Sequence, residues 1–71
     1  MNTILIFKTN IKTNEDLLMV NDALDKHQHI QEWSVDIEDV DCVLRVVSSH
    51  ITTHDIISII NQTGYSCQEL D

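Results

Sequence analysis

The sequence predicts a single α+β domain in which two helices pack on one face of a four-stranded antiparallel sheet. Three observations lead to this prediction. The chain has 71 residues, the length of one small domain. Over residues 3 to 70, strand-like and helix-like segments follow one another as strand, helix, strand, strand, helix, strand. Both helix-like segments are preceded by a threonine with an aspartate three residues later, which is typical of a helix N-cap.

The first half of the chain supplies a strand and a helix. Ile4–Phe7 is an uninterrupted apolar run, as in a central strand whose two faces are both covered. Thr13 and Asp16 have the spacing of a capping box, with aspartate in place of the usual glutamate. The first helix is therefore predicted from about Asn14 to Lys26. Residues at helical spacing give it one apolar face: Leu17, Val20, Ala23, Leu24 and His27.

The second half supplies a hairpin, a second helix and a last strand. Trp33–Glu38 alternates strictly between apolar and polar residues, and Cys42–Val47 is a second strand-like run after a tight turn. Thr52 begins another sequence that resembles a capping box. The helix that follows ends at Gly64, the only glycine in the chain, which suits a left-handed C-cap. Tyr65–Leu70 is predicted to be a short final strand.

This order of elements predicts a ferredoxin-like split β-α-β sandwich with strand order 4-1-3-2. In this topology, chain direction brings the loop before the first helix, the hairpin turn and the turn at the glycine to one end of the molecule. The loop after the first helix and the loop before the second helix meet at the other end. The two ends determine which candidate functional residues lie close together.

Composition and charge argue against several classes of function. The net charge of −8, with only four Lys and Arg residues, disfavours nucleic acid, whose binding requires neutralised phosphates. No apolar run is long enough to span a membrane. The first residues lack the basic region and cleavage site of a signal peptide, so a cytoplasmic protein is expected. No Gly-rich phosphate loop or strained nucleophile turn is present, so the sequence indicates no enzyme.

Residues along nearly the whole chain match the pattern of a known family. The matching positions are Val20 and Ala23–Leu24 in the first helix, Val35–Ile37 in the second strand, and Ile60–Tyr65 at the end of the second helix. On these residues the sequence resembles the heavy-metal-associated domains, which include copper chaperones and the N-terminal modules of copper pumps. The resemblance implies a ferredoxin-like fold and descent from a metal-handling protein.

The metal-binding motif of that family is absent. Heavy-metal-associated domains carry two cysteines, separated by two residues, in the loop between the first strand and the first helix. The matching positions here are Thr13 and Asp16. Threonine offers no accessible anion, and a single aspartate is a hard ligand that binds weakly alone, whereas Cu(I) prefers thiolates. We therefore expect both residues to cap the helix and not to bind copper.

The two cysteines of the chain lie outside this loop. Cys42 is expected to face the core in the third strand and to behave as a small hydrophobe. Cys67 lies in the last strand and is expected to be partly exposed. Since the first strand separates their strands, their Cα atoms should be roughly 9–10 Å apart, which is beyond disulfide range. Cys67 remains a candidate metal ligand.

Four histidines form a second group of candidate ligands. His27 and His29 follow the first helix, and His50 and His54 flank the start of the second. Chain direction brings all four to the end opposite the family's metal loop. Both spacings occur in metal sites, because imidazole suits Zn, Cu and Ni. An alternative hypothesis is therefore a metal-binding or trafficking protein that uses these histidines or Cys67 to bind Zn or Cu. A purely structural role and a pH response also remain open.

The open face of the predicted sheet gives the leading hypothesis. If the helices cover Ile4 and Ile6, the opposite face carries an apolar patch: Leu5, Phe7, Val43 and Val47. The reverse assignment is also open, because the first strand is apolar on both sides. Either assignment leaves an apolar face that needs a cover, and such patches often mark partner or self-association surfaces. The leading hypothesis is a non-enzymatic binding module without a cofactor, acting through an unknown protein partner or a homodimer.

Overall fold

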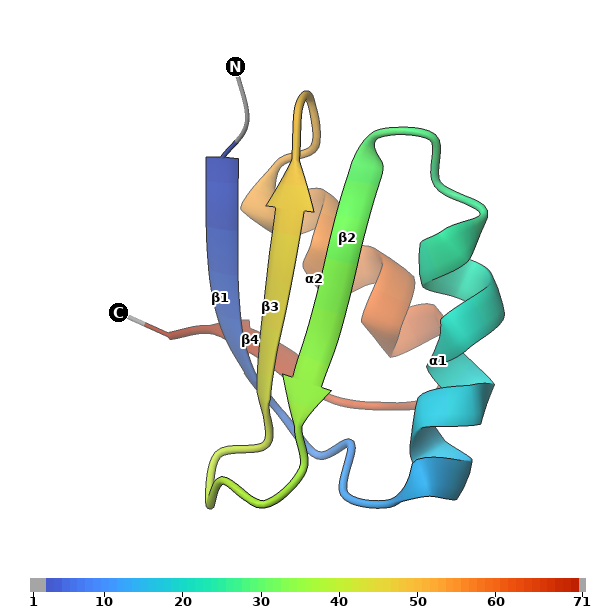
Figure 1. Ribbon diagram of the computed structural model, residues 1–71, viewed down its shortest axis with the longest axis vertical. Helices are drawn as coiled ribbons and strands as arrows, with labels where there is room; N and C mark the ends of the chain where they lie inside the picture. Colours follow the sequence, from blue (N-terminus) through green and yellow to red (C-terminus); the bar gives the residue numbers. More distant parts are fainter. Residues whose placement is uncertain (1–2, 71) are drawn as a thin grey trace.

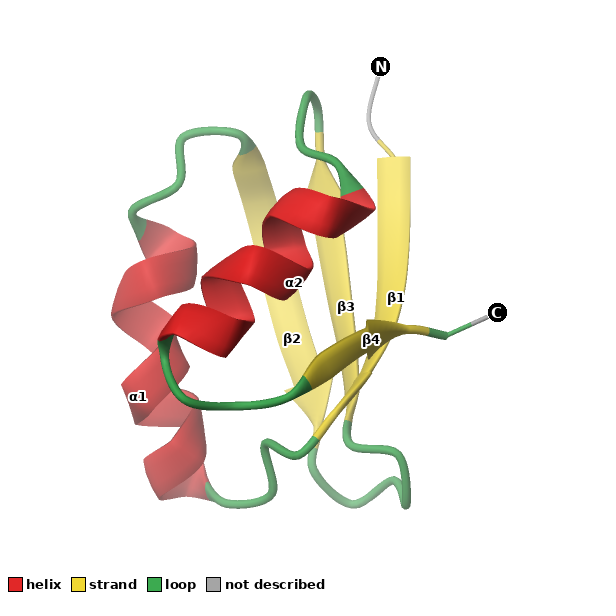
Figure 2. Ribbon diagram, turned by 180° about the vertical axis from the view of Figure 1, so that it is seen from behind, coloured by secondary structure: helices red, strands yellow, loops and turns green. Residues whose placement is uncertain are grey.

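The computed structural model describes residues 3–70 of the chain. Its elements in order are β1 (Thr3–Thr9), α1 (Asn14–Asp25), β2 (Ile30–Asp36), β3 (Val43–Ser48), α2 (Thr53–Gln62) and β4 (Cys67–Glu69). The strands form one antiparallel sheet in the order β2-β3-β1-β4 (Figure 1). Both helices lie on the same side of this sheet, as the view from behind shows (Figure 2). The predicted fold class and strand order are confirmed.

Both helices begin with a complete capping box, as the sequence predicted. In α1, the Thr13 hydroxyl accepts a hydrogen bond from the Asp16 N–H at 3.1 Å, and the Asp16 carboxylate accepts from the Thr13 N–H at 3.2 Å. Thr52 and Asp55 make the same pair of bonds at the start of α2. After α2, Gly64 has a φ of 96°, a left-handed conformation that glycine adopts without a steric penalty.

The hairpin strands are shifted along the chain relative to the prediction. β2 begins earlier than expected, because Ile30 pairs with Ser48 and a bulge between Ile30 and Glu32 extends the ladder. β3 begins one residue later than expected, because Cys42 belongs to the hairpin loop. Cys42 has a positive φ of 46°, and its N–H donates to the Asp39 carbonyl at 2.9 Å. β4 is shorter than predicted and contains three residues.

The structure settles which face of β1 packs against the helices. Phe7 lies opposite Leu44 in the β1–β3 ladder, and Leu5 lies opposite Val46. Directly opposite residues of an antiparallel pair share a face of the sheet, and both Leu44 and Val46 are fully buried. Phe7 is fully buried and Leu5 packs against the core. The predicted placement of Leu5 and Phe7 on the open face is therefore wrong, and the reverse assignment holds.

The hydrophobic core fills the space between the sheet and the two helices. It consists of Phe7, Ile11, Val20, Leu24, Leu44, Val46, Ile51, Ile56 and Ile60. Two of these residues lie in loops: Ile11 precedes α1 and Ile51 precedes α2. Each of these loops is therefore fixed to the core immediately before a helix begins.

The loops gather at the two ends of the sheet, as chain direction predicted. In Figure 1 the β1–α1 loop, the β2–β3 hairpin loop and the turn between α2 and β4 lie toward the lower end. The α1–β2 and β3–α2 loops lie at the upper end. The loop that carries the cysteines in heavy-metal-associated domains and the loops that carry the histidines here are thus on opposite ends of the domain.

Candidate functional site

Hydrogen bonds close the β1–α1 loop at Thr13 and Asp16. Oδ2 of Asp16 accepts from the backbone N–H groups of Lys12 at 3.0 Å and Thr13 at 3.2 Å. Oδ1 of Asp16 accepts from the Tyr65 hydroxyl at 2.6 Å. Both carboxylate oxygens are therefore occupied by donors from this loop and from the turn after α2. A metal ion at Asp16 would have to displace these bonds.

These bonds also determine the ionisation of the loop. The hydrogen bond from Tyr65 and the backbone N–H of Lys12 lower the pKa of Asp16 below its ordinary value. The same bond to Asp16 raises the pKa of the Tyr65 hydroxyl. Asp16 is thus an anion at neutral pH whose charge already has three hydrogen-bond donors. The predicted capping role of Thr13 and Asp16 is confirmed, and the bond from Tyr65 is an addition that the sequence analysis missed.

Three of the four histidines meet at the opposite end of the domain. The ring centroids of His27 and His29 are 5.7 Å apart, and those of His29 and His50 are 5.3 Å apart with nearly perpendicular planes. Nδ1 of His27 accepts the N–H of His29 at 3.3 Å, which leaves Nε2 of His27 for other contacts. His54 is exposed in the first turn of α2. Within residues 3–70, no three His, Cys, Asp or Glu side chains are arranged to hold a metal ion together.

The cysteines do not join the histidines. Both are free thiols, and Cys42 is buried as predicted, although it lies just before β3 and not within it. Its carbonyl accepts from the Thr9 hydroxyl at 2.7 Å. Cys67, the first residue of β4, pairs with Thr9, the last residue of β1. Burial raises the pKa of the Cys67 thiol to about 11, so this thiol is protonated at neutral pH and is a weak nucleophile and ligand.

The open face of the sheet, defined as the face away from the helices, is built from alternate residues of its strands. Ile4 and Ile6 belong to it, since they lie opposite Val47 and Arg45. Its members are Ile4, Ile6 and Lys8 from β1, Glu32, Ser34 and Asp36 from β2, Val43, Arg45 and Val47 from β3, and Gln68 from β4. The predicted members Val43 and Val47 are confirmed. Ile4 is 53% exposed, and Ile6, Val43 and Val47 are half-buried.

The charges of the open face balance one another. Its two acids, Glu32 and Asp36, lie on β2, whereas its two bases, Lys8 and Arg45, lie on the central strands β1 and β3. Arg45 is 3.7 Å from Glu32, and Lys8 is 3.7 Å from Asp41 in the hairpin loop. The face therefore has no net formal charge in a chain whose net charge is −8. The excess negative charge lies on the helices, the loops, Glu69 of β4 and Asp71.

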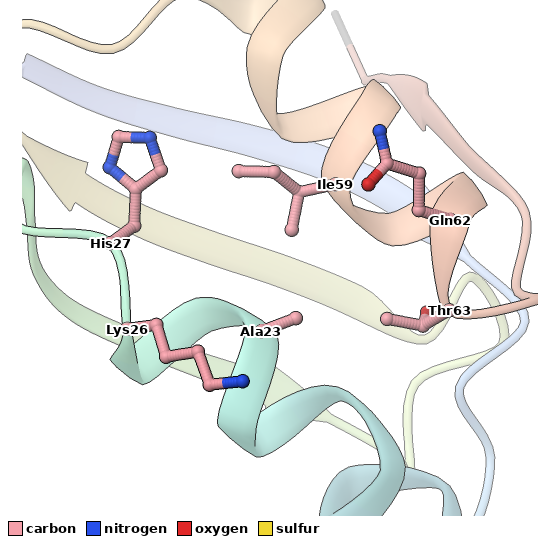
Figure 3. A pocket seen from close by; sticks show the side chains of 6 residues that line it. All are labelled: Ala23, Lys26, His27, Ile59, Gln62 and Thr63. Carbon is pink, nitrogen blue, oxygen red and sulfur yellow. The ribbon is translucent and has the colours of Figure 1, made fainter.

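A pocket of about 400 Å³ lies between α1 and α2 (Figure 3). It is lined by Ala23, Lys26, His27, Ile59, Gln62 and Thr63. The amide of Gln62 donates to the Ser58 hydroxyl at 3.4 Å, and the hydroxyl of Thr63 donates to the Ile60 carbonyl at 2.6 Å. These polar groups are therefore already bonded within the end of α2. The pocket has no nucleophile paired with a base among its lining residues, so it does not resemble a catalytic centre.

The fold is that of the heavy-metal-associated domain, as solved structures show. Oxidised MerP from Ralstonia metallidurans CH34 matches 100% of this chain and 100% of its own, with a TM-score of 0.84 and 11% identity. The apo heavy-metal-associated domain of the copper chaperone for superoxide dismutase also has a TM-score of 0.84, with 15% identity over 100% of this chain and 69% of the other. The CsoZ metallochaperone has a TM-score of 0.79 and 17% identity over 96% and 99% of the two chains.

Sequence comparison adds no closer assignment. No family model matches the chain, and no curated protein matches it. At 11–17% identity the likeness to the solved structures shows the fold alone. In the described part of the chain, neither helix has the length and hydropathy needed to cross a membrane.

Proposed function

We propose that this chain is a small, non-enzymatic binding module that keeps the heavy-metal-associated fold and works without a thiolate metal site. One observation carries this proposal. At the two positions that match the family's cysteines, Thr13 and Asp16 cap α1, and Asp16 is also bound by Tyr65. The loop therefore has a structural role, because its hydrogen bonds hold α1 and the turn after α2 in place.

Binding is proposed to take place through protein contact at the open face of the sheet. This face combines the exposed side chain of Ile4 and half-buried aliphatic neighbours with balanced charges, whereas the helix side and the loops are acidic. An apolar patch with a polar rim is the usual composition of a protein interface. The two free cysteines are consistent with a reducing compartment, so the proposal places the protein in the cytoplasm.

A capture experiment with matched variants tests the proposal. The wild type, Ile4→Lys and Met19→Lys are immobilised, exposed to extract from the source cells, cross-linked and compared by quantitative mass spectrometry. Ile4 and Met19 are both exposed aliphatic residues, at 53% and 62%, but only Ile4 lies on the open face. We expect the bound proteins to be lost with Ile4→Lys and kept with Met19→Lys. Equal capture by all three would show that the open face is not the binding surface.

A second candidate function is metal binding at the histidine end. It is favoured by the approach of three imidazoles, with ring centroids 5.3–5.7 Å apart in the chain His27–His29–His50. Small rotations of these side chains would allow two or three nitrogens to share a Zn(II) or Cu(II) ion. Cys67 would have to lose a proton from a thiol of raised pKa to serve as a ligand elsewhere.

Zinc titration by calorimetry distinguishes this second candidate. If the histidine end is a metal site, one equivalent binds, and His29→Ala abolishes binding because His29 lies between the other two rings. His54→Ala is the matched control, since His54 is exposed in α2 and adjoins Asp55. Binding that survives His29→Ala, or that falls equally with either variant, would exclude this site.

A further inference from the structure

We infer that the open face of the sheet binds a second copy of this chain, so that the protein self-associates through a two-fold axis. The inference rests on the proposed function, which names the face but not its partner. It is carried by three features of the open face: its aliphatic side chains, its lack of net charge, and the placement of both its acids on the edge strand β2. Each feature fits a self-complementary interface.

The apolar part of the open face spans neighbouring residues of β3, β1 and the segment after β4. Ile4 lies opposite Val47 in the ladder, and Ile6 follows on the same face. The N–H of Leu70 donates to the Ile6 carbonyl at 3.0 Å, which continues the β1–β4 ladder beyond β4 and keeps Leu70 beside Ile6. Along β3, Arg45 lies between Val47 and Val43 on this face, and Val43 is half-buried. These side chains offer an aliphatic surface that a second identical surface can cover.

Electrostatics limits where two copies can approach each other. Each copy carries a net charge of −8, so contact between acidic helix faces or loops would be repulsive. The open face carries two acids and two bases, and contact there keeps the acidic helices on the outer sides of the assembly. The only other surface-exposed large apolar residues in the described chain are Leu18, Met19 and Val40. Those three have acidic neighbours: Glu15, Asp16 and Asp22 near the first two, and Asp39 and Asp41 around the third.

The positions of the charges favour one orientation of the two-fold axis. The acids lie on the edge strand β2, where Glu32 pairs with Arg45 of the adjacent strand β3 and Asp36 remains for contact with Lys8 of a second copy. An axis parallel to the strands lays β2 of each copy against the β1–β4 side of the other, so that Asp36 approaches Lys8 of the second copy. An axis across the strands would place β2 on β2 and acid against acid. Self-complementary charge therefore selects the parallel axis.

The size of the face predicts a weak association. Strands of seven, seven, six and three residues, at about 3.3 Å per residue and about 4.8 Å between strands, give a flat area of roughly 360 Å². That is about half of the roughly 800 Å² per partner that a stable interface buries. The dimer should therefore form in the micromolar range or above and dissociate on dilution, as transient complexes do.

Sedimentation velocity on the purified, reduced chain tests the inference, over concentrations from about 10 μM to about 1 mM. We expect the wild type to change from monomer to dimer over this range. Ile4→Lys should weaken dimerisation by about tenfold or more, because it places an unpaired charge in an apolar contact. Met19→Lys makes the same charge change on α1 and should leave dimerisation within about twofold of the wild type.

A second pair of variants tests the orientation of the axis. Asp36→Lys and Asp22→Lys change the net charge equally, but only Asp36 lies on the open face. With the axis parallel to the strands, Asp36→Lys brings lysine against Lys8 of the second copy and weakens the dimer relative to Asp22→Lys. If Asp36→Lys instead strengthens the dimer relative to Asp22→Lys, the acids face each other and the proposed orientation is overturned.

The outcomes separate this inference from the proposed function. A wild type that stays monomeric up to about 1 mM would show that the open face does not bind a second copy of the chain. The capture experiment then decides independently whether the open face binds another protein. A dimer that is unaffected by Ile4→Lys, with folding confirmed by circular dichroism, shows that self-association uses another surface and also overturns the inference.

Discussion

Asp16 shows how one carboxylate can organise the loop before a helix. In a thiolate site, a metal ion would join two positions of the β1–α1 loop. Here the carboxylate of Asp16 joins the backbone of Lys12 and Thr13 to the hydroxyl of Tyr65, which lies 49 residues away. The bond to Tyr65 ties the start of α1 to the turn that follows α2. The charge of Asp16 is therefore required for the local structure.

This network predicts a loss of stability in acid. The pKa of Asp16 is lowered in the folded state, chiefly by Tyr65, and that of Asp55 is lowered by its bonds to Thr52. A carboxyl group with a lowered folded pKa contributes stability above its unfolded pKa of about 3.8, and this contribution is lost as the pH falls through the folded pKa. Urea unfolding between pH 6 and pH 2 should show this decrease, and Asp16→Asn should make it shallower.

Tyr65 gives the same network an opposite dependence at alkaline pH. Its pKa is raised in the folded state, so its contribution is present below the unfolded pKa of about 10 and is lost as the pH rises through the folded value. Tyr65→Phe is the control, since it removes both the alkaline decrease and the largest cause of the lowered Asp16 pKa. An unchanged acid dependence in both Asp16→Asn and Tyr65→Phe would contradict the network.

Ser48 supplies a second prediction at the scale of one residue. Its side chain is 1% exposed on the helix side of β3, and its hydroxyl has no hydrogen-bond partner among residues 3–70. An unpaired buried hydroxyl is destabilising, so Ser48→Ala should raise the free energy of unfolding by about 1 kcal/mol. Ser34→Ala, at an exposed position of the neighbouring strand, should change it by less than about 0.5 kcal/mol. A marked destabilisation by Ser48→Ala would show that the hydroxyl is bonded.

At the scale of elements, the helices were more predictable than the faces of the first strand. The capping residues Thr13 and Thr52 and the terminal Gly64 act within a few residues of sequence, so local patterns reveal them. The faces of β1 depend on long-range packing, because Ile4–Phe7 is apolar throughout. The sequence does contain one indication of the correct face. Lys8 shares a face with Ile4 and Ile6, and this face should be the open side of the sheet because lysine is rarely buried.

The corrected faces of β1 lead to a prediction for that strand. Phe7 is fully buried, so Phe7→Ala should destabilise the domain by about 3–5 kcal/mol. A core of this size provides only about 3–5 kcal/mol of net stability, so the variant should be largely unfolded. Ile4→Ala removes an exposed side chain from the same strand and should cost less than about 1 kcal/mol. Thermal melting followed by circular dichroism would show both effects, and equal melting temperatures would contradict the assignment.

For the whole molecule, the sequence predicted the fold more completely than it predicted the candidate functional site. Chain direction correctly brought His27, His29 and His50 to one end, because it depends only on topology. It could not show the bond between Asp16 and Tyr65, since the two residues are far apart in sequence and either is common in loops. The sequence predicted that one face of the sheet is open. Which residues of β1 lie on that face became known only from the register of β1 against β3.

Taken as a whole, the domain has an acidic helix side and a neutral, aliphatic sheet side on a metallochaperone-like scaffold. In the proposal, the metal loop has become a structural cap and the sheet has become the interface. The scaffold should still accept a metal site if the two cysteines are restored.

Cu(I) titration of the reduced protein against a competing chelator tests the central claim most directly. The wild type is compared with the double variant Thr13→Cys/Asp16→Cys, which restores two thiolates on the β1–α1 loop. We predict no tight binding by the wild type and one tightly bound equivalent in the double variant. Tight binding of one Cu(I) by the wild type, lost on substitution of Asp16 or Cys67, would contradict the account and make this chain a metal carrier.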